Sequence, residues 1–195
     1  MSSIEKGMKV ITLNKDEFRK CCRDLKTGVR ASGFRFDTLV GIATGGDFVA
    51  SEFEFESTLS IRRQRSLTAA KQGGLGTLIS RLPRRINNLL RMAEASCREL
   101  CDHIIPPHAE ELQLSPEIKA QLSGARKILV VDDAIDSGAT AASVVASIKK
   151  AAPQADVRLA VITVTRPHPL IRADYSVFGP RTLVRFPWSA DSRQS

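Results

Sequence analysis

The sequence lacks the features of two large classes of protein. No segment approaches the roughly 18 consecutive apolar residues that a membrane-spanning helix needs, although hydrophobic residues make up 43% of the 195 residues. The first residues, MSSIEKGMKVITL, do not show the basic and then apolar pattern of a signal peptide. We therefore expect a cytoplasmic protein with no membrane partner.

Cysteine and histidine are also scarce. The four cysteines form two pairs, Cys21 with Cys22 and Cys97 with Cys101, and neither pair has the spacing of a zinc knuckle or a redox dithiol. The three histidines are scattered along the chain. We therefore expect buried free thiols and no protein-bound zinc.

Acidic residues are absent from one long stretch, from Ser57 to Ala93, in a chain with a formal net charge of +8 and a pI near 9.7. The cations of this stretch are Arg62, Arg63, Arg65, Lys71, Arg81, Arg84, Arg85 and Arg91. Such a local basic field implies an anionic partner, either nucleic acid or a polyphosphate ligand. For the part from Arg81 to Arg91, a solvated helix face is the simpler interpretation.

Apolar runs alternate with helical patterns along the chain. Strands are expected at residues 9–13, 37–44, 58–64, 127–131 and 156–165, helices at 15–32, from 45 toward 55, after Ser115 and at 137–151, and extended structure at 175–188. Asn14 and Glu17 form a capping-box pattern before the first helix, and Ser115 and Pro116 open a later one. Strands that are apolar throughout and alternate with helices predict an α/β fold, a mainly parallel sheet flanked by helices.

The chain reads as one domain, residues 1–195, with a helical insertion at about 75–124. Within the insertion, apolar residues recur at spacings of three and four, at Ile86, Leu89, Leu90, Ala93, Cys97 and Leu100. This stripe can pack on the sheet or on a second subunit, and the sequence leaves both open.

The segment KILVVDDAIDSGATAASVV, from Lys127 to Val145, carries the strongest functional signal. Asp132 and Asp133 follow a buried strand, at the edge of a parallel sheet where ligands bind. The loop Asp136-Ser137-Gly138-Ala139-Thr140 then presents backbone amides, hydroxyls and a helix N-terminus to an anion. Carboxylates beside an anion cradle suit the hydroxyls and phosphate of a ribose 5-phosphate, or an Mg²⁺ shell. The simpler alternative is a helix N-cap in which Asp136 alone is needed.

Residues Ile128 to Thr140, ILVVDDAIDSGAT, resemble the phosphoribosyl pyrophosphate (PRPP) signature of type I phosphoribosyltransferases. The resemblance implies that fold, that Asp132 and Asp133 bind the ribose and Mg²⁺, directly or through water, and that Asp136 to Thr140 bind the 5-phosphate. It also implies that Asp136 lies near the incoming base and can act as its catalytic proton acceptor. The alternative role of Asp136, holding the amides of the phosphate loop, has equal weight.

The resemblance further implies a pyrophosphate loop at Ala43-Thr44-Gly45-Gly46, which often holds a non-proline cis peptide in the family. Many members have Lys or Arg where Thr44 stands. A mobile loop after Ser60 would bring Arg62 or Arg63 to the pyrophosphate.

The C-terminal segment, about 166–190, resembles the end of xanthine-guanine-type purine phosphoribosyltransferases. By that match Arg166 would meet an exocyclic oxygen of a purine, and Leu183 and Val184 would bind the ring. Leu183 replaces the usual aromatic stacking residue, and Trp188 is expected to be a packing residue.

Together these motifs predict transfer of a phosphoribosyl group from PRPP to a purine-like base with release of pyrophosphate and with Mg²⁺ as cofactor. The resemblance also implies a homodimer, the usual state in the family. One alternative is a specialised transferase whose acceptor is not a salvage base. The other is a non-catalytic regulator that senses PRPP or a nucleotide and binds nucleic acid. An aromatic content of 5% and the absence of a helix-turn-helix or zinc-finger signature count against nucleic acid.

Overall fold

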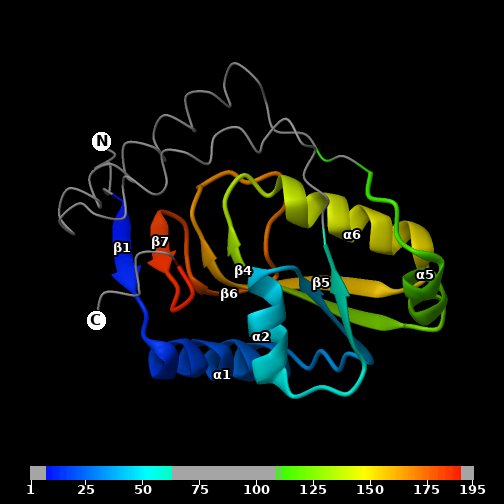
Figure 1. The fold of residues 1–195 in the computed structure, drawn as a ribbon, viewed down its shortest axis with the longest axis horizontal. Helices are drawn as coiled ribbons and strands as arrows, with labels where there is room; N and C mark the ends of the chain where they lie inside the picture. Colours follow the sequence, from blue (N-terminus) through cyan, green and yellow to red (C-terminus); the bar gives the residue numbers. More distant parts are fainter. Residues whose placement is uncertain (1–7, 63–108, 110, 190–195) are drawn as a thin grey trace.

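Figure 1 shows the computed structural model of the chain, which describes residues 8–62, 109 and 111–189. Within these residues a five-stranded parallel sheet has the order β3-β2-β4-β5-β6. Its strands are β2 (Thr38–Ile42), β3 (Thr58–Ile61), β4 (Lys127–Ile135), β5 (Asp156–Val164) and β6 (Tyr175–Phe178). A two-stranded parallel sheet pairs β1 (Lys9–Thr12) with β7 (Thr182–Arg185), so segments from the two ends of the chain lie side by side.

Helices cover both faces of the five-stranded sheet. They are α1 (Lys15–Ala31), α2 (Gly45–Phe53), α5 (Pro116–Ser123) and α6 (Ala139–Ala151). Alternate residues of β2 divide between two cores, with Leu39 packed in the core of α1 and α2, and Val40 in the core of α5 and α6. Both side chains have no exposed surface. Burial on two faces explains the continuous apolar runs, and the α/β fold expected from the sequence is confirmed.

Local signals located the starts of α1 and α5, whereas α6, expected from Ser137, begins at Ala139. The Asn14 amide donates to Glu17 Oε2 at 2.8 Å and the Glu17 amide donates to Asn14 Oδ1 at 2.9 Å, which completes the capping box of α1. Ser115 caps α5. Cys21 and Cys22 are buried free thiols, and burial raises the pKa of Cys22 to about 12. Cys97 and Cys101 lie outside the described residues.

Some strand ends differ from the expectation. β4 continues to Ile135 because β5 runs beside it, with Asp132 opposite Val161 and Ile135 opposite Val164. Asp132 and Asp133 therefore lie within the strand. β3 ends at Ile61, earlier than expected. Most of the expected insertion, including its apolar stripe, lies outside the described residues, so its role stays a prediction.

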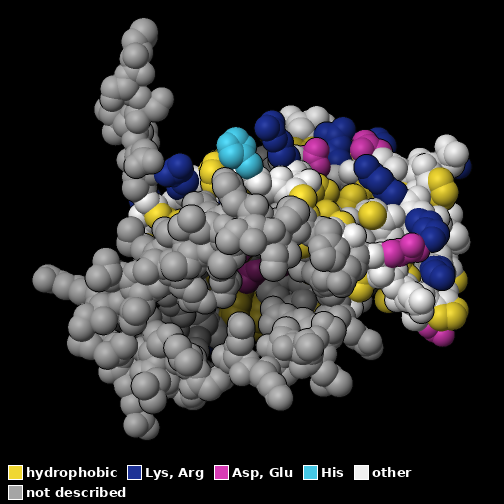
Figure 2. All heavy atoms as spheres, turned by 90° about the horizontal axis from the view of Figure 1, so that it is seen from above, with side chains coloured by type: hydrophobic (Ala, Val, Ile, Leu, Met, Phe, Trp, Pro, Cys, Tyr) yellow, Lys and Arg dark blue, Asp and Glu magenta, His cyan; other side chains and the backbone are white. Residues whose placement is uncertain are grey.

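In residues 8–62, 109 and 111–189, no helix has the length and hydrophobicity to cross a bilayer. Seen from above, side chains of both charge signs are intermixed over the coloured part of the surface (Figure 2). Of the basic stretch from Ser57 to Ala93, only residues 57–62 belong to the described part of the chain.

Candidate functional site

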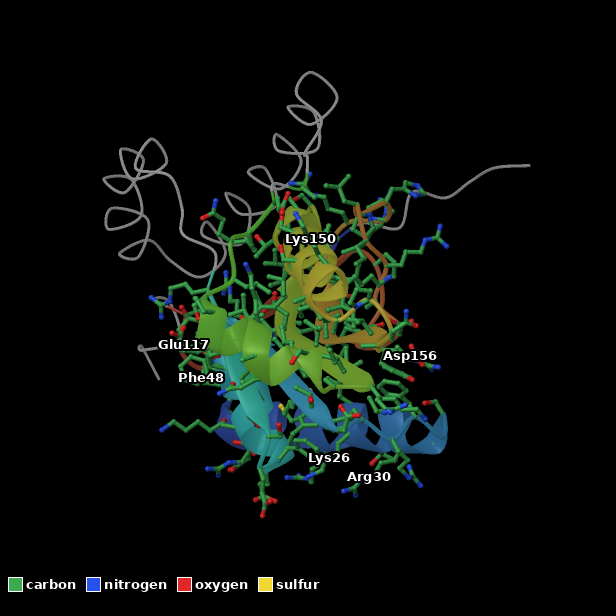
Figure 3. All side chains as sticks on the ribbon, turned by 90° about the vertical axis from the view of Figure 1, so that its right-hand side faces the viewer. Lys26, Arg30, Phe48, Glu117, Lys150 and Asp156 are labelled. Carbon is green, nitrogen blue, oxygen red and sulfur yellow. The ribbon has the colours of Figure 1, made fainter. Side chains whose placement is uncertain are left out.

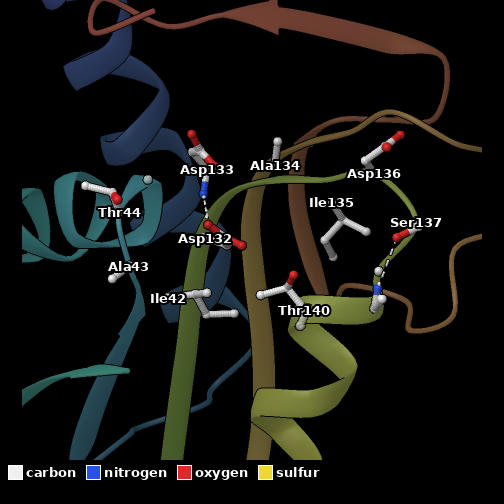
Figure 4. Close-up of a pocket in the computed structure, with 14 residues that line it drawn as sticks. Ile42, Ala43, Thr44, Asp132, Asp133, Ala134, Ile135, Asp136, Ser137 and Thr140 are labelled. Carbon is white, nitrogen blue, oxygen red and sulfur yellow. Dashed lines mark hydrogen bonds between the residues drawn. The ribbon is translucent and has the colours of Figure 1, made fainter. Parts of the chain in front are cut away.

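A cavity of about 370 Å³ lies beside the carboxyl ends of β2 and β4 (Figure 4). Two continuous segments line it, residues 42–45 and residues 132–141. These are the two loops that the sequence singled out, although about ninety positions separate them along the chain. The parallel pairing of β2 with β4, with Gly41 opposite Val131, brings them together.

The loop after β4 is shaped by a glycine in the left-handed region. Gly138 has a φ of 80° and is the N-cap of α6, where it has no side chain to cap the helix. The Ala139 amide donates to Ser137 Oγ at 3.4 Å. A Cβ at Gly138 would also lie 3.0 Å from the Leu170 amide nitrogen. That amide donates to the Ser137 carbonyl oxygen at 2.9 Å, so the segment after β5 supports the loop from behind. The first turn of α6 thus lines the cavity, where a helix start can offer backbone amides to an anion.

The acid pair has its two side chains on opposite sides of the strand (Figure 4). The Asp133 amide donates to Asp132 Oδ1 at 2.9 Å. The Asp133 carboxylate lies directly against Gly45, where a Cβ would come within 2.2 Å of its Cγ. Asp133 therefore connects β4 to the first turn of α2.

The surroundings of both carboxyl groups disfavour their ionised forms. Desolvation, followed by repulsion from Asp133, raises the pKa of Asp132 well above its usual range. Desolvation also raises the pKa of Asp133, against smaller lowering effects that include hydrogen bonding with the Trp188 side chain. A bound cation or hydroxyl donors would relieve this repulsion.

The loop after β2 approaches β4 very closely. The Ala43–Thr44 peptide is cis, as the resemblance implied, and Thr44 is the N-cap of α2 without a side-chain cap bond. A Cβ at Gly46 would lie 2.4 Å from the Val131 carbonyl oxygen. Only glycine permits this contact, which sets the start of α2 against the acid pair.

Asp136 and Arg166 form an ion pair that the sequence did not predict. Arg166 Nε donates to Asp136 Oδ1 at 2.8 Å, and its Nη2 donates to Asp136 Oδ2 at 3.0 Å. The Arg166 side chain is 10% exposed and that of Asp136 is 44% exposed. The guanidinium group of Arg166 is thus directed at Asp136, which itself lines the cavity.

Three further expected site residues, Arg62, Leu183 and Val184, are not among the described residues that line this cavity. Arg62 is exposed at the end of the first described segment, and Arg63 lies outside it. Leu183 and Val184 lie in β7, opposite Val10 and Ile11 of β1. The assignment of these residues to pyrophosphate and base stays a prediction.

Trp188 is packed in an aromatic stack. Its ring centroid lies 4.3 Å from that of Phe48 and 5.0 Å from that of Phe186, with interplanar angles of 23° and 9°. Phe18 meets it edge-on at 4.9 Å. Both faces of the indole are thus covered by protein rings, in agreement with the packing role expected for it.

The donor set for a metal ion is small. Among the described residues, no group of three or more His, Cys, Asp or Glu side chains could hold a metal ion. Asp132 and Asp133 both line the cavity, and a cation beside them would relieve the repulsion that contributes to the raised pKa of Asp132. Mg²⁺ is commonly bound through one or two carboxylates with substrate phosphates and water, so Asp132, alone or with Asp133, fits such an ion.

Sequence reasoning assigned no role to several residues that line or support the site. Ile42, Ala134, Ile135 and Ala141 also line the cavity, and Leu170 supports its phosphate loop. Ala134 and Ile135 lie inside the motif from Ile128 to Thr140 and Ile42 inside an expected strand, but none of them was given a role in the site. Arg166 was singled out, but its partner Asp136 is thirty positions away and could not be paired with it from the sequence.

Solved structures with a similar fold include two phosphoribosyltransferases and one hypothetical protein. A purine phosphoribosyltransferase from Pyrococcus horikoshii has a TM-score of 0.57 at 16% identity, with 93% of this chain and 95% of that chain covered. The xanthine-guanine-hypoxanthine phosphoribosyltransferase of Helicobacter pylori has a TM-score of 0.54 at 14% identity, with the same coverage of 93% and 95%. A hypothetical protein from Neisseria gonorrhoeae with bound ppGpp has a TM-score of 0.58 at 16% identity, covering 95% of this chain and 92% of that chain.

These similarities show that the chain has the type I phosphoribosyltransferase fold, as the motif at Asp132 predicted. No protein-family model and no curated protein matches the sequence. At such low identity the similarity concerns the fold alone, and function has to be argued from the site.

Proposed function

We propose that the chain binds PRPP and transfers its phosphoribosyl group to a nitrogenous base, with release of pyrophosphate. The cavity between the loops at Thr44 and Ser137 carries this proposal, because it combines two helix starts whose N-cap residues make no side-chain cap bond with an acid pair. Each helix start suits one phosphate-bearing end of PRPP, and the acid pair suits the sugar hydroxyls between them.

In this mechanism the loop at Gly138 holds the 5-phosphate through amides of the first turn of α6 and the hydroxyls of Ser137 and Thr140. Asp132 accepts hydrogen bonds from the ribose hydroxyls and, with Asp133, is the side-chain part of an Mg²⁺ site. When bound, Mg²⁺ neutralises charge on the pyrophosphate group that leaves. The loop from Ala43 to Gly45 holds that group with backbone amides.

Asp136 is the group of the cavity best placed to accept a proton from an incoming base. Its carboxylate is partly exposed and is oriented by both nitrogens of the Arg166 fork. In this role Arg166 acts through Asp136, which differs from the direct contact with a purine oxygen that the resemblance implied. The two hydrogen bonds from Arg166 fix the orientation of the carboxylate at the cavity, where an incoming base would meet it.

Isothermal titration with Mg²⁺ and three probes tests the binding half of the proposal. Ribose 5-phosphate and pyrophosphate should each bind, and PRPP should bind more tightly than either because it spans both loops. Thr140→Val should weaken ribose 5-phosphate about tenfold through the loss of a hydroxyl and leave pyrophosphate unchanged. Ser123→Ala, on the exposed side of α5, is the matched control. No binding of ribose 5-phosphate by the wild-type protein would refute the proposal.

Pyrophosphate release from PRPP in the presence of a panel of bases tests the chemical half. Release that depends on both Mg²⁺ and one base identifies the transferase and its acceptor. Release only with acceptors outside the common purines would identify a specialised transferase.

A second candidate function is a non-catalytic sensor of PRPP or a nucleotide. It is favoured by one observation, the similar fold of the Neisseria gonorrhoeae protein that has ppGpp bound. For this chain it predicts that PRPP or ppGpp binds in the same cavity and that no base in the panel releases pyrophosphate.

A further inference from the structure

A second cavity, of about 480 Å³, lies at the C-terminal ends of α1 and α2. Its lining residues are Lys26, Arg30, Phe34, Arg35, Phe36, Phe53, Glu54 and Phe55. The cavity at the acid pair includes Gly45, the first residue of α2, whereas this one includes Phe53, the last. Nine residues of helix rise by about 12 Å, so the two cavities are separate.

Phenylalanine rings form the floor of the second cavity. The ring centroid of Phe36 lies 4.7 Å from that of Phe55 and 6.3 Å from that of Phe53. Phe34 is 6.5 Å from Phe36 and, like Phe53, is buried. Phe36 and Phe55 are only half-buried, so their rings offer apolar surface to a ligand.

Positive charge surrounds this floor. Lys26, Arg30 and Arg35 line the cavity against one carboxylate, that of Glu54. Lys26 is already used in the fold, since its Nζ donates to the Phe53 carbonyl oxygen at 2.8 Å. Both arginines are exposed, and Figure 3 shows Lys26 and Arg30 on the lower side of the molecule, on α1. Arg35 Nη1 donates to the Arg30 carbonyl oxygen at 3.3 Å, which holds the two residues together. The other N–H groups of the two guanidinium groups can bind a carboxylate or phosphate.

We propose that this cavity binds a small organic anion that carries a flat ring, such as an aryl phosphate or aryl carboxylate, independently of the site at the acid pair. The ring would lie on Phe36 and Phe55, and the anionic group would meet Arg30 and Arg35. The cavity volume falls within the range of about 300–1,000 Å³ typical of ligand pockets. Neither the motifs nor the proposed transfer reaction uses any of these residues.

Amide NMR of the ¹⁵N-labelled full chain tests this proposal, because it locates each probe on the protein. Phenyl phosphate carries the ring and the charge, inorganic phosphate only the charge, and benzyl alcohol only the ring. Phenyl phosphate should shift the amides of residues 34–36 and 53–55 and saturate these shifts at a concentration about tenfold lower than either partial probe. Shifts at Gly138 to Thr140 report binding to the phosphate loop and are analysed separately.

The double variant Arg30→Gln with Arg35→Gln should weaken phenyl phosphate at residues 34–36 by about tenfold or more, since it removes two charge-assisted contacts. Phe55→Leu should weaken the same shifts and leave those at Gly138 unchanged. Arg23→Gln, an exposed change on α1 away from the cavity, is the matched control and should leave both sets of shifts unchanged.

Three results would overturn the proposal: shifts confined to the phosphate loop, equal saturation by benzyl alcohol and phenyl phosphate, or an unchanged affinity in the double arginine variant. The spectrum of each variant without probe shows whether its fold is intact. Failure of ribose 5-phosphate to bind would refute the proposed transferase and leave this second site untouched.

Discussion

Replacing Gly46 with alanine tests how α2 is set against β4. A Cβ there would lie 2.4 Å from the Val131 carbonyl oxygen and 3.2 Å from the Asp132 Cα. Because both obstacles are backbone atoms, no side chain can rotate away. The first turn of α2 must move off β4 by about 1 Å to restore an ordinary contact.

Over-packing of this kind costs about 1–3 kcal/mol. For a chain of 195 residues, a cost near 2 kcal/mol lowers Tm by roughly 4–8 °C. The same movement displaces the loop from Ala43 to Gly45, so we expect the affinity for pyrophosphate with Mg²⁺ to fall about tenfold. Thermal unfolding followed by circular dichroism measures the first effect, and calorimetric titration the second.

Gly28→Ala is the matched control, because a Cβ at Gly28 meets nothing within 4 Å and the residue has helical backbone in the last turn of α1. Alanine there should stabilise the protein by up to about 1 kcal/mol. A Gly46→Ala protein that melts at or above the wild-type temperature, beside a stabilised Gly28→Ala protein, would refute the described packing of α2 on β4.

Three further predictions concern the acid pair, the ion pair and the first helix cap. Since the folded pKa of Asp132 is raised, its contribution to stability is fully present below its usual pKa of 3.8 and is lost as the pH rises through the higher folded value. Asp132→Asn should therefore raise Tm of the ligand-free protein at pH 7 and abolish ribose 5-phosphate binding. The Tm difference between the variant and the wild type should grow between about pH 4 and neutrality, and a constant difference contradicts the prediction. Asp136→Asn should lower the free energy of unfolding by about 2 kcal/mol, because it leaves the more buried Arg166 without its carboxylate partner. Arg166→Met should lower it by less, and urea unfolding of the two variants measures this order. Asn14→Ala should lower the free energy of unfolding by about 1 kcal/mol, because α1 loses its N-cap. The affinity for PRPP should stay unchanged, and a loss of affinity would contradict the view that this cap is independent of the site.

Short-range patterns in the sequence were sufficient for much of the fold. The capping box at Asn14 needs residues only three positions apart, and the strand at Leu39 is recognisable because both of its faces are buried. The two loops of the site were found for the same reason, since each is a continuous run of small, polar or acidic residues after an apolar strand. Their meeting in one cavity follows from the rule that parallel strands gather their carboxyl ends.

Long-range pairings were beyond such reasoning. Nothing near Lys9 indicates that it pairs with Thr182 at the other end of the chain. The extension of β4 through the acid pair depends on the ladder with β5, and the ion pair of Asp136 with Arg166 depends on where β5 ends. Each is decided by contacts between segments far apart in the sequence, which short patterns do not record.

The aromatic stack at the C-terminal end has a practical consequence. Trp188 is the only tryptophan of the sequence, and it lies between Phe48 and Phe186 with its side chain interacting with Asp133. All indole fluorescence of the protein therefore originates beside the acid pair. Any ligand that changes the charge or position of Asp133 should alter this emission, so the unlabelled chain contains its own optical probe.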